Sequence, residues 1–200
     1  MLTERFPAAF AYACALHKGQ TRKGVPTPYV SHLMAVSALV LENGGNEDQA
    51  IAGLLHDAVE DQGGLATARE IFNRFGPAVG KIVMSCTDAA APPSALKPAW
   101  RERKLAFIER LDEIAPEAAL VITCDKIHNL SCLIRDVERE GVGTLARFRR
   151  PASLAWYYQA IATALQRFRS RAPVDHLQAL AHRFAALTAD QALPRGDARA

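Results

Sequence analysis

One eight-residue block, Leu54-Leu55-His56-Asp57-Ala58-Val59-Glu60-Asp61, constrains the fold of this chain more than any other segment. Its apolar and polar residues recur with the period of a helix. We expect this helix to begin at Asn46 and to end before Gly63. At about 100° per residue, the imidazole and the three carboxylates share one side of that helix. The apolar residues occupy the opposite side, so one face packs and the other carries four ionisable groups.

The ionisable face contains three carboxylates and one imidazole but no lysine. Like charges this close disfavour one another unless a cation is present, which argues against a simple solvated face. An adjacent His-Asp pair is costly to bury alone, and a divalent metal satisfies both groups. His32 and Asp125 would complete the ligand set with His56 and Asp57. Two imidazoles and two carboxylates suit Mn²⁺ or Fe²⁺, and Mg²⁺ less well.

A polar stripe follows near the middle of the chain, where Asp125, His128, Asn129 and Cys132 have the spacing of one helix face. Polar groups on a buried helix need partners, and a metal at Asp125 with His128 and Asn129 beside it would provide them. Taken alone, the stripe fits an ordinary surface ion pair about equally well. Taken alone, His32 is better explained as a hydrogen-bonded core histidine.

Helical periodicity dominates the 200 residues, of which 50% are hydrophobic and 22% charged. No alternating strand pattern or internal repeat is visible. We therefore expect a single all-α domain over residues 1–190, a bundle of roughly eight or nine helices. A surface loop over residues 89–98 and a flexible tail over residues 191–200 complete the expected organisation.

Several classes of protein are disfavoured by composition. The net charge of +3 is too mild to indicate nucleic-acid binding, and no apolar stretch reaches the roughly 18 residues of a membrane span. The N-terminus lacks a signal-peptide pattern, and the four cysteines form no CxxC motif. We expect a cytoplasmic protein without nucleic-acid or membrane partners, and the sequence leaves a homo-oligomer open.

Four motifs in order carry a family resemblance. They are His17-Lys-Gly-Gln-Thr-Arg22-Lys23, Pro28-Tyr29-x-x-His32, His56-Asp57-x-x-Glu60-Asp61 and Asp125-x-x-His128-Asn129. Over residues 5–165 the chain resembles the hydrolase domain of the RelA/SpoT proteins, and most of all the stand-alone small alarmone hydrolases of the HD superfamily, similar to the metazoan SpoT homologues.

The resemblance implies a reaction and a site. The reaction is removal of the 3′-pyrophosphate from (p)ppGpp, which gives GDP or GTP and pyrophosphate. One Mn²⁺ would be bound by His32, His56, Asp57 and Asp125. Glu60 and Asp61 would act on the attacking water and the leaving group. The residues implied to contact the purine nucleotide are Arg22 against the base, Lys23 at phosphate, Asn129 at the nucleoside and Lys104 near the phosphates.

The chain also departs from the family pattern. The loop over residues 24–28 is one residue longer than in the long RelA/SpoT enzymes, Leu33 replaces a usual proline, and Cys132 replaces an expected threonine. Two of these changes fall where base and ribose would lie, so hydrolysis of (p)ppApp is an alternative. Another HD-type nucleotide phosphohydrolase and a non-catalytic alarmone-binding regulator also remain open.

Overall fold

The computed structural model describes residues 1–88, 98–148 and 150–189, and these residues are helical almost throughout. The all-α prediction is confirmed, with ten α-helices and three short 3-10 helices in the described segments against the eight or nine expected. The α-helices are α1 (Arg5–Leu16), α2 (Val30–Glu42), α3 (Glu47–Leu55), α4 (Ala58–Asp61), α5 (Leu65–Phe75), α6 (Pro77–Cys86), α7 (Trp100–Arg110), α8 (Pro116–Glu140), α9 (Leu154–Ala164) and α10 (Val174–Ala189). The 3-10 helices are η1 (Val142–Arg147), η2 (Pro151–Ser153) and η3 (Leu165–Phe168).

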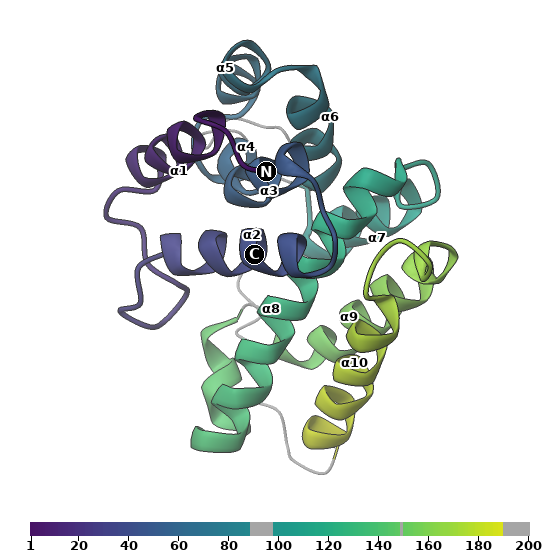
Figure 1. The fold of residues 1–200 in the computed structure, drawn as a ribbon. Coiled ribbons are helices and arrows are strands. Elements are labelled where there is room, and N and C mark those ends of the chain that lie inside the picture. Colours follow the sequence, from purple (N-terminus) through teal and green to yellow (C-terminus); the bar gives the residue numbers. More distant parts are fainter. Residues whose placement is uncertain (89–97, 149, 190–200) are drawn as a thin grey trace.

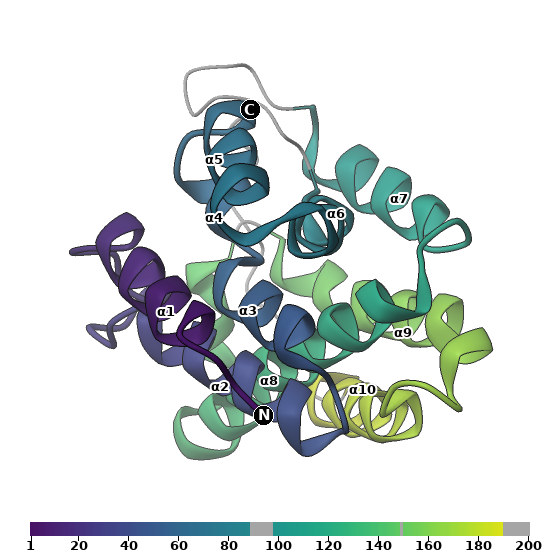
Figure 2. The ribbon, with the colours of Figure 1, turned by 45° about the horizontal axis from the view of Figure 1, so that its top comes forward.

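Helix α3 lies at the centre of the N-terminal half and packs against α1, α2, α6 and α8 (Figure 2). Its residues are almost all buried, and Ile51, Leu54 and Leu55 are inaccessible or nearly so. Helix α8 runs through the molecule and continues to the second group of helices, where α10 packs against it and α9 against α10 (Figure 1). A 25-residue helix therefore connects both halves of the core.

The expected N-terminal cap of α3 is present. Asn46 Oδ1 accepts from the Gln49 amide at 3.0 Å, and Gln49 Oε1 accepts from the Asn46 amide at 3.0 Å. This reciprocal capping box satisfies two of the amides that a helix start leaves without partners.

The prediction of one continuous helix through the His-Asp block is wrong. Helix α3 ends at Leu55, and α4 begins at Ala58 after a turn at His56 and Asp57. His56 Nδ1 donates to the Gly53 carbonyl at 2.9 Å, which is the carbonyl that a continuous helix offers to the amide of residue 57. The side chain thus competes with the helical ladder, and Asp57 takes φ −95° and ψ −5°. Periodicity alone carries no signal for such a local bond.

Gly53 allows α2 and α3 to approach closely. A Cβ atom on Gly53 would lie 3.0 Å from Ser37 Cα and 3.2 Å from its amide nitrogen. The Ser37 hydroxyl also donates to the Ala50 carbonyl at 2.9 Å across the same contact. This close approach brings His32 of α2 beside the turn that carries His56.

The predicted loop and tail fall mainly on residues 89–97 and 190–200, which lie outside the described residues. The domain limit at residue 190 therefore stays a prediction. Within the described segments, no helix combines the length and apolar character needed to cross a membrane.

We predict that Gly53→Ala destabilises the fold by about 1–3 kcal/mol, because the added methyl group overpacks a contact with backbone. A thermal melt followed by circular dichroism measures this, with roughly 2–4 °C lost per kcal/mol in a chain of this size. Gly143→Ala is the matched control, since a Cβ there meets no atom within 4 Å. Equal melting temperatures for the two variants would contradict the proposed tight contact.

Candidate metal centre and active site

Four side chains from three parts of the chain converge in the core. His32 comes from α2, His56 and Asp57 from the turn after α3, and Asp125 from α8. The two imidazole Nε2 atoms are 3.2 Å apart, and Asp125 Oδ1 lies 3.2 Å from that of His32 and 3.5 Å from that of His56. Asp57 Oδ2 lies 3.0 Å from His56 Nε2 and 3.6 Å from His32 Nε2. One potential ligand atom from each of His32, His56 and Asp57 lies within 4.8 Å of the other two.

The hydrogen bonds behind the two imidazoles decide which nitrogen faces the cluster. His56 Nδ1 must carry a proton because its partner, the Gly53 carbonyl, only accepts. In the neutral ring, Nε2 then presents a lone pair. His32 Nδ1 contacts His128 Nδ1 at 2.7 Å, so the His32 Nε2 atom also faces inward. With both rings neutral and protonated on Nδ1, two Nε2 lone pairs and two carboxylate oxygens meet, and this donor set fits a divalent cation.

The charges of the cluster show that it requires a positive charge, from a proton or from a metal ion. Burial opposes the charged form of His56, but the carboxylates of Asp57 and Asp125 outweigh it and raise the pKa of His56 well above its usual range. Burial raises the pKa of Asp57, yet the neighbouring His56 and His32 hold it well below the ordinary value. Asp57 and Asp125 thus stay ionised. A proton on His56 supplies the positive charge that a bound cation would otherwise bring.

Two neighbours hold the carboxylates in place. The Tyr29 hydroxyl donates to Asp57 Oδ2 at 2.6 Å. Lys126 Nζ contacts Asp125 Oδ2 at 2.7 Å, on the other oxygen from the one that faces the imidazoles. Although burial works against its charge, Asp125 raises the pKa of Lys126, so the lysine stays cationic. The sequence analysis did not identify Tyr29 or Lys126 as part of the site.

Glu60 lies in the short helix α4, three residues after Asp57. Burial and the nearby carboxylate of Asp88 raise the pKa of Glu60. Arg103 Nη1 lies 3.6 Å from Glu60 Oε1 and 3.7 Å from Asp88 Oδ2. Lys104, the residue expected near phosphate, forms an ion pair with Asp88. Both cations therefore turn toward the buried carboxylates, and Arg103 is the one in contact with Glu60.

Asp61 is exposed and lies at the end of a short hydrogen-bond chain. Gln20 Nε2 donates to Asp61 Oδ2 at 2.8 Å, and Gln20 Oε1 contacts His17 Nδ1 at 2.8 Å. The His17 ring stacks on Tyr29 with centroids 5.3 Å apart. The motif that begins at His17 thus supports both Asp61 and, through Tyr29, Asp57.

A cavity of about 520 Å³ is lined by Tyr29, His128 and Asn129, which contact the cluster residues. Arg22 and Lys23 line one side of it, and His128, Asn129 and Cys132 of α8 line the other. Arg22 Nη2 donates to Asn129 Oδ1 at 2.6 Å, and Asn129 Nδ2 donates to Asp125 Oδ1 at 2.5 Å. The structure therefore links Arg22 and Asn129 to one carboxylate of the cluster.

The expected site residues gather in one region around this cluster. Those at the cluster itself are His32, His56, Asp57 and Asp125, with Glu60 and Asp61 beside it, Arg22, Lys23 and Asn129 on the cavity wall, and Lys104 paired with Asp88. Gln20 and Tyr29 lie within quoted motifs, so motif membership was the available signal for them. Lys126 and Arg103 differ from ordinary surface cations only by burial.

Comparisons with known proteins agree on the fold. Residues 9–150 match the HD domain family. Guanosine-3′,5′-bis(diphosphate) 3′-pyrophosphohydrolase MESH1 of Xenopus tropicalis is 37% identical over 131 residues, which cover 64% of this chain and 66% of that protein. The human protein of the same name is 34% identical with the same coverage. The matched region thus spans slightly less than two thirds of these relatives.

Two solved structures are similar. A metazoan ortholog of SpoT superposes with a TM-score of 0.71 at 24% identity, covering 93% of this chain and 96% of that one. The structure of lmo0812 from Listeria monocytogenes gives a TM-score of 0.65 at 28% identity, covering 75% and 96%. Given the family match over residues 9–150 and the helical arrangement shared with these structures, the chain belongs to the HD domain family.

Proposed function

We propose that this protein hydrolyses the 3′-pyrophosphate of (p)ppGpp, with GDP or GTP and pyrophosphate as products. The observation that carries the proposal is a buried cluster of two imidazoles and two carboxylates, joined through Asn129 to the wall of a cavity with cationic side chains. Relatives that match over 131 residues are named as hydrolases of this bond, which supports the assignment.

The donor set suits a divalent cation, and we propose Mn²⁺ held by His32, His56, Asp57 and Asp125. When bound, such a cation supplies Lewis-acid chemistry, because it polarises phosphoryl oxygens and makes water more acidic. His128 and the Gly53 carbonyl fix the rings of the two histidines, and Tyr29 fixes Asp57. These contacts preset the site and reduce the reorganisation needed for binding.

Glu60 and Asp61 are proposed to act on the reacting groups. A carboxylate with a raised pKa accepts a proton more readily, so Glu60 is suited to take the proton of the attacking water. Arg103 near Glu60 and Lys104 near Asp88 bring two cations to the same side, where they would meet the leaving pyrophosphate. Gln20 holds Asp61 in position to assist.

The nucleoside would occupy the cavity. Arg22 lies at its wall and presents a guanidinium that can stack on a purine, while Asn129 offers an amide to the nucleoside. Lys23, on the same wall, would meet phosphate.

A second candidate is hydrolysis of (p)ppApp. Val25, Pro26 and Thr27 of the longer loop line the cavity together with Cys132, so these departures from the family pattern contact the space proposed for the nucleoside. They can change the choice between guanine and adenine without altering the metal ligands. We further propose a single domain over residues 1–190 and a cytoplasmic location, without nucleic-acid or membrane partners.

We expect the purified protein with Mn²⁺ to release pyrophosphate from ppGpp, pppGpp or pppApp, and to lose this activity in EDTA. Anion-exchange analysis of the products identifies the bond cleaved and ranks the purines. A metal-loaded sample that leaves all three compounds intact would favour another HD phosphohydrolase or a binding protein.

Removal of a proposed metal ligand should abolish both binding and turnover. His56→Ala and Asp57→Ala are expected to bring bound Mn²⁺ close to zero and to reduce the rate by at least about a hundredfold. Metal content by mass spectrometry and initial rates measure the two effects separately. His176→Ala is the control, because this histidine is exposed on α10. Full turnover in either ligand variant would show that the metal assignment is wrong.

Glu60→Gln should separate the metal from the chemistry. The amide cannot take up a proton from water, so we expect a rate loss of about a hundredfold or more with unchanged Mn²⁺ content. Glu113→Gln, an exposed change outside the site, is the matched control. Loss of metal from the Glu60 variant would make Glu60 a ligand instead.

A further inference from the structure

The polar stripe on α8 continues beyond Cys132 and changes its charge. After Asp125, His128, Asn129 and Cys132, the same face carries Arg135, Asp136 and Arg139. Every member of this series after Asp125 lines the 520 Å³ cavity. One helix face therefore leads from a carboxylate at the candidate metal centre to arginines at the far end of the cavity.

The length of this stripe suits one nucleotide. Ten residues separate Asp125 from Arg135, a rise of about 15 Å, but helical side chains lean back toward the N-terminus. Arg135 Nη2 reaches Cys132 Sγ at 3.3 Å, one turn earlier. Its guanidinium therefore lies about 10 Å along the axis from Asp125. A nucleoside whose 3′ side faces the metal centre would direct its 5′ side toward this guanidinium.

Arg147, Arg135 and Arg139, at the far end of the cavity, differ in whether a carboxylate already neutralises their charge. Arg147 forms an ion pair with Asp136 and packs on Gly24, where a Cβ would lie 2.7 Å from Arg147 Cδ. This pair builds the wall. Arg135, in contrast, makes no ion pair with a carboxylate in the described segments, and Arg139 contacts only the adjacent, exposed Glu140 at 2.5 Å. An exposed pair of this kind is weak, so Arg139 can turn to another anion.

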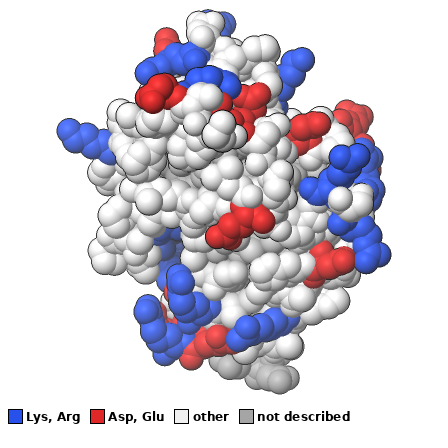
Figure 3. Space-filling model, in the orientation of Figure 1, with Lys and Arg blue, Asp and Glu red and all other residues white. Residues whose placement is uncertain are grey.

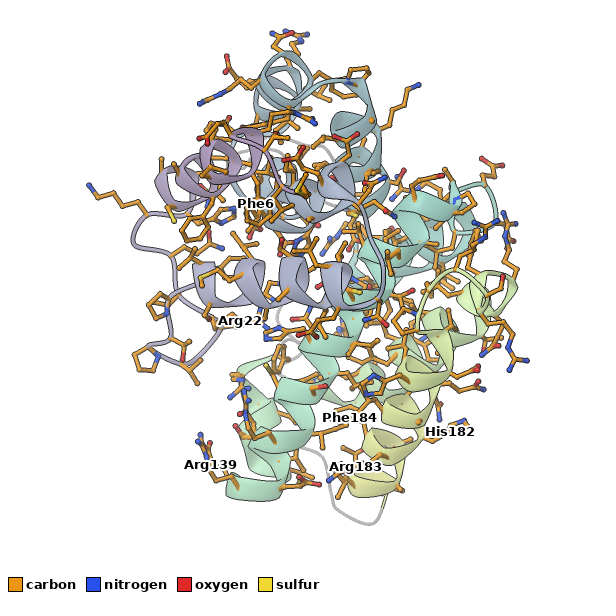
Figure 4. The ribbon with its side chains drawn as sticks, viewed as in Figure 1. Phe6, Arg22, Arg139, His182, Arg183 and Phe184 are labelled. Carbon is orange, nitrogen blue, oxygen red and sulfur yellow. The ribbon has the colours of Figure 1, made fainter. Side chains whose placement is uncertain are left out.

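The surface view supports this assignment. Basic side chains gather at the lower left of Figure 3, over the end of α8 seen in Figure 1. Figure 4 shows Arg139 on the last turn of α8 and Arg22 between α2 and α8, both on this side of the molecule. Across the cavity, Lys23 Nζ lies over the Phe148 ring at 5.1 Å.

We propose that Arg135 and Arg139 form a subsite for the 5′-phosphate chain of the nucleotide. The inference rests on the proposed function, which places the 3′ side at the metal centre. Guanidinium groups bind phosphate through charge-assisted hydrogen bonds, and two of them one turn apart can follow a di- or triphosphate. The subsite makes the protein selective for nucleotides phosphorylated at both the 3′ and the 5′ position.

The test compares guanosine 3′-pyrophosphates that carry one, two or three 5′-phosphates, or the adenosine series if the purine ranking selects it. In the native protein KM should fall with each added 5′-phosphate while kcat stays nearly constant. Arg135→Gln and Arg139→Gln should each raise KM for the 5′-triphosphate about tenfold, the size of one charge-assisted hydrogen bond. The effect on the 5′-monophosphate should be much smaller.

Arg183→Gln is the matched control, because Arg183 of α10 pairs with Glu138 of α8 at 2.5 Å and is exposed outside the cavity. Thermal melts of all variants verify folding. A KM that ignores the number of 5′-phosphates, or variants that behave like the control, would overturn the subsite while leaving the proposed function intact.

A separate binding experiment tests the subsite in the case that the proposed function is wrong. If no 3′-pyrophosphate is hydrolysed, that function is wrong, and calorimetric binding of GTP to metal-free protein still tests the arginines. About tenfold weaker GTP binding in Arg135→Gln and Arg139→Gln, but not in Arg183→Gln, supports the subsite. Unchanged binding in all three variants contradicts it.

Discussion

A buried group of acceptor atoms without an internal donor is the constraint on which the rest of this structure depends. His32 Nε2, His56 Nε2, Asp57 Oδ2 and Asp125 Oδ1 meet in the core, and such a group is stable only with a cation or with added protons. The surrounding helices hold these four side chains in place. They aim the imidazoles through backbone and His128 contacts, and they fix each carboxylate with Tyr29 or Lys126.

Helix α8 gives the site its direction. Its buried face joins the two halves of the core, while one polar stripe on it carries Asp125, Asn129 and the arginines near its end. Because helical positions are rigidly spaced, the separation between the metal centre and the far cations cannot change without bending the helix. A pocket built from loops would not fix this separation. The other walls come from the segment that precedes α2, which carries Arg22 and Lys23, and from Arg147, Phe148 and Tyr158.

Sequence reasoning reached the fold class and the residues that gather at the cluster, because periodicity and motif spacing report helix faces directly. It failed where a local bond competes with periodicity, as at His56, whose side chain takes the Gly53 carbonyl and ends α3. It named Lys104 but not Arg103, because a helical period does not show that both adjacent cations turn toward Asp88. Lys126 was missed for the same reason, because nothing in a sequence distinguishes a buried lysine beside an aspartate from an exposed one.

Gly53 has a consequence for how the protein relates stability to chemistry. Its missing side chain lets α2 approach α3, and its carbonyl holds the ring of His56. The same residue therefore sets both the distance between the two imidazoles and the tautomer that one of them presents. Folding and metal binding are therefore coupled. Formation of the contact between α2 and α3 creates the metal site, and metal binding stabilises that contact. A change that weakens the packing of α2 against α3 therefore also lowers the affinity for a metal.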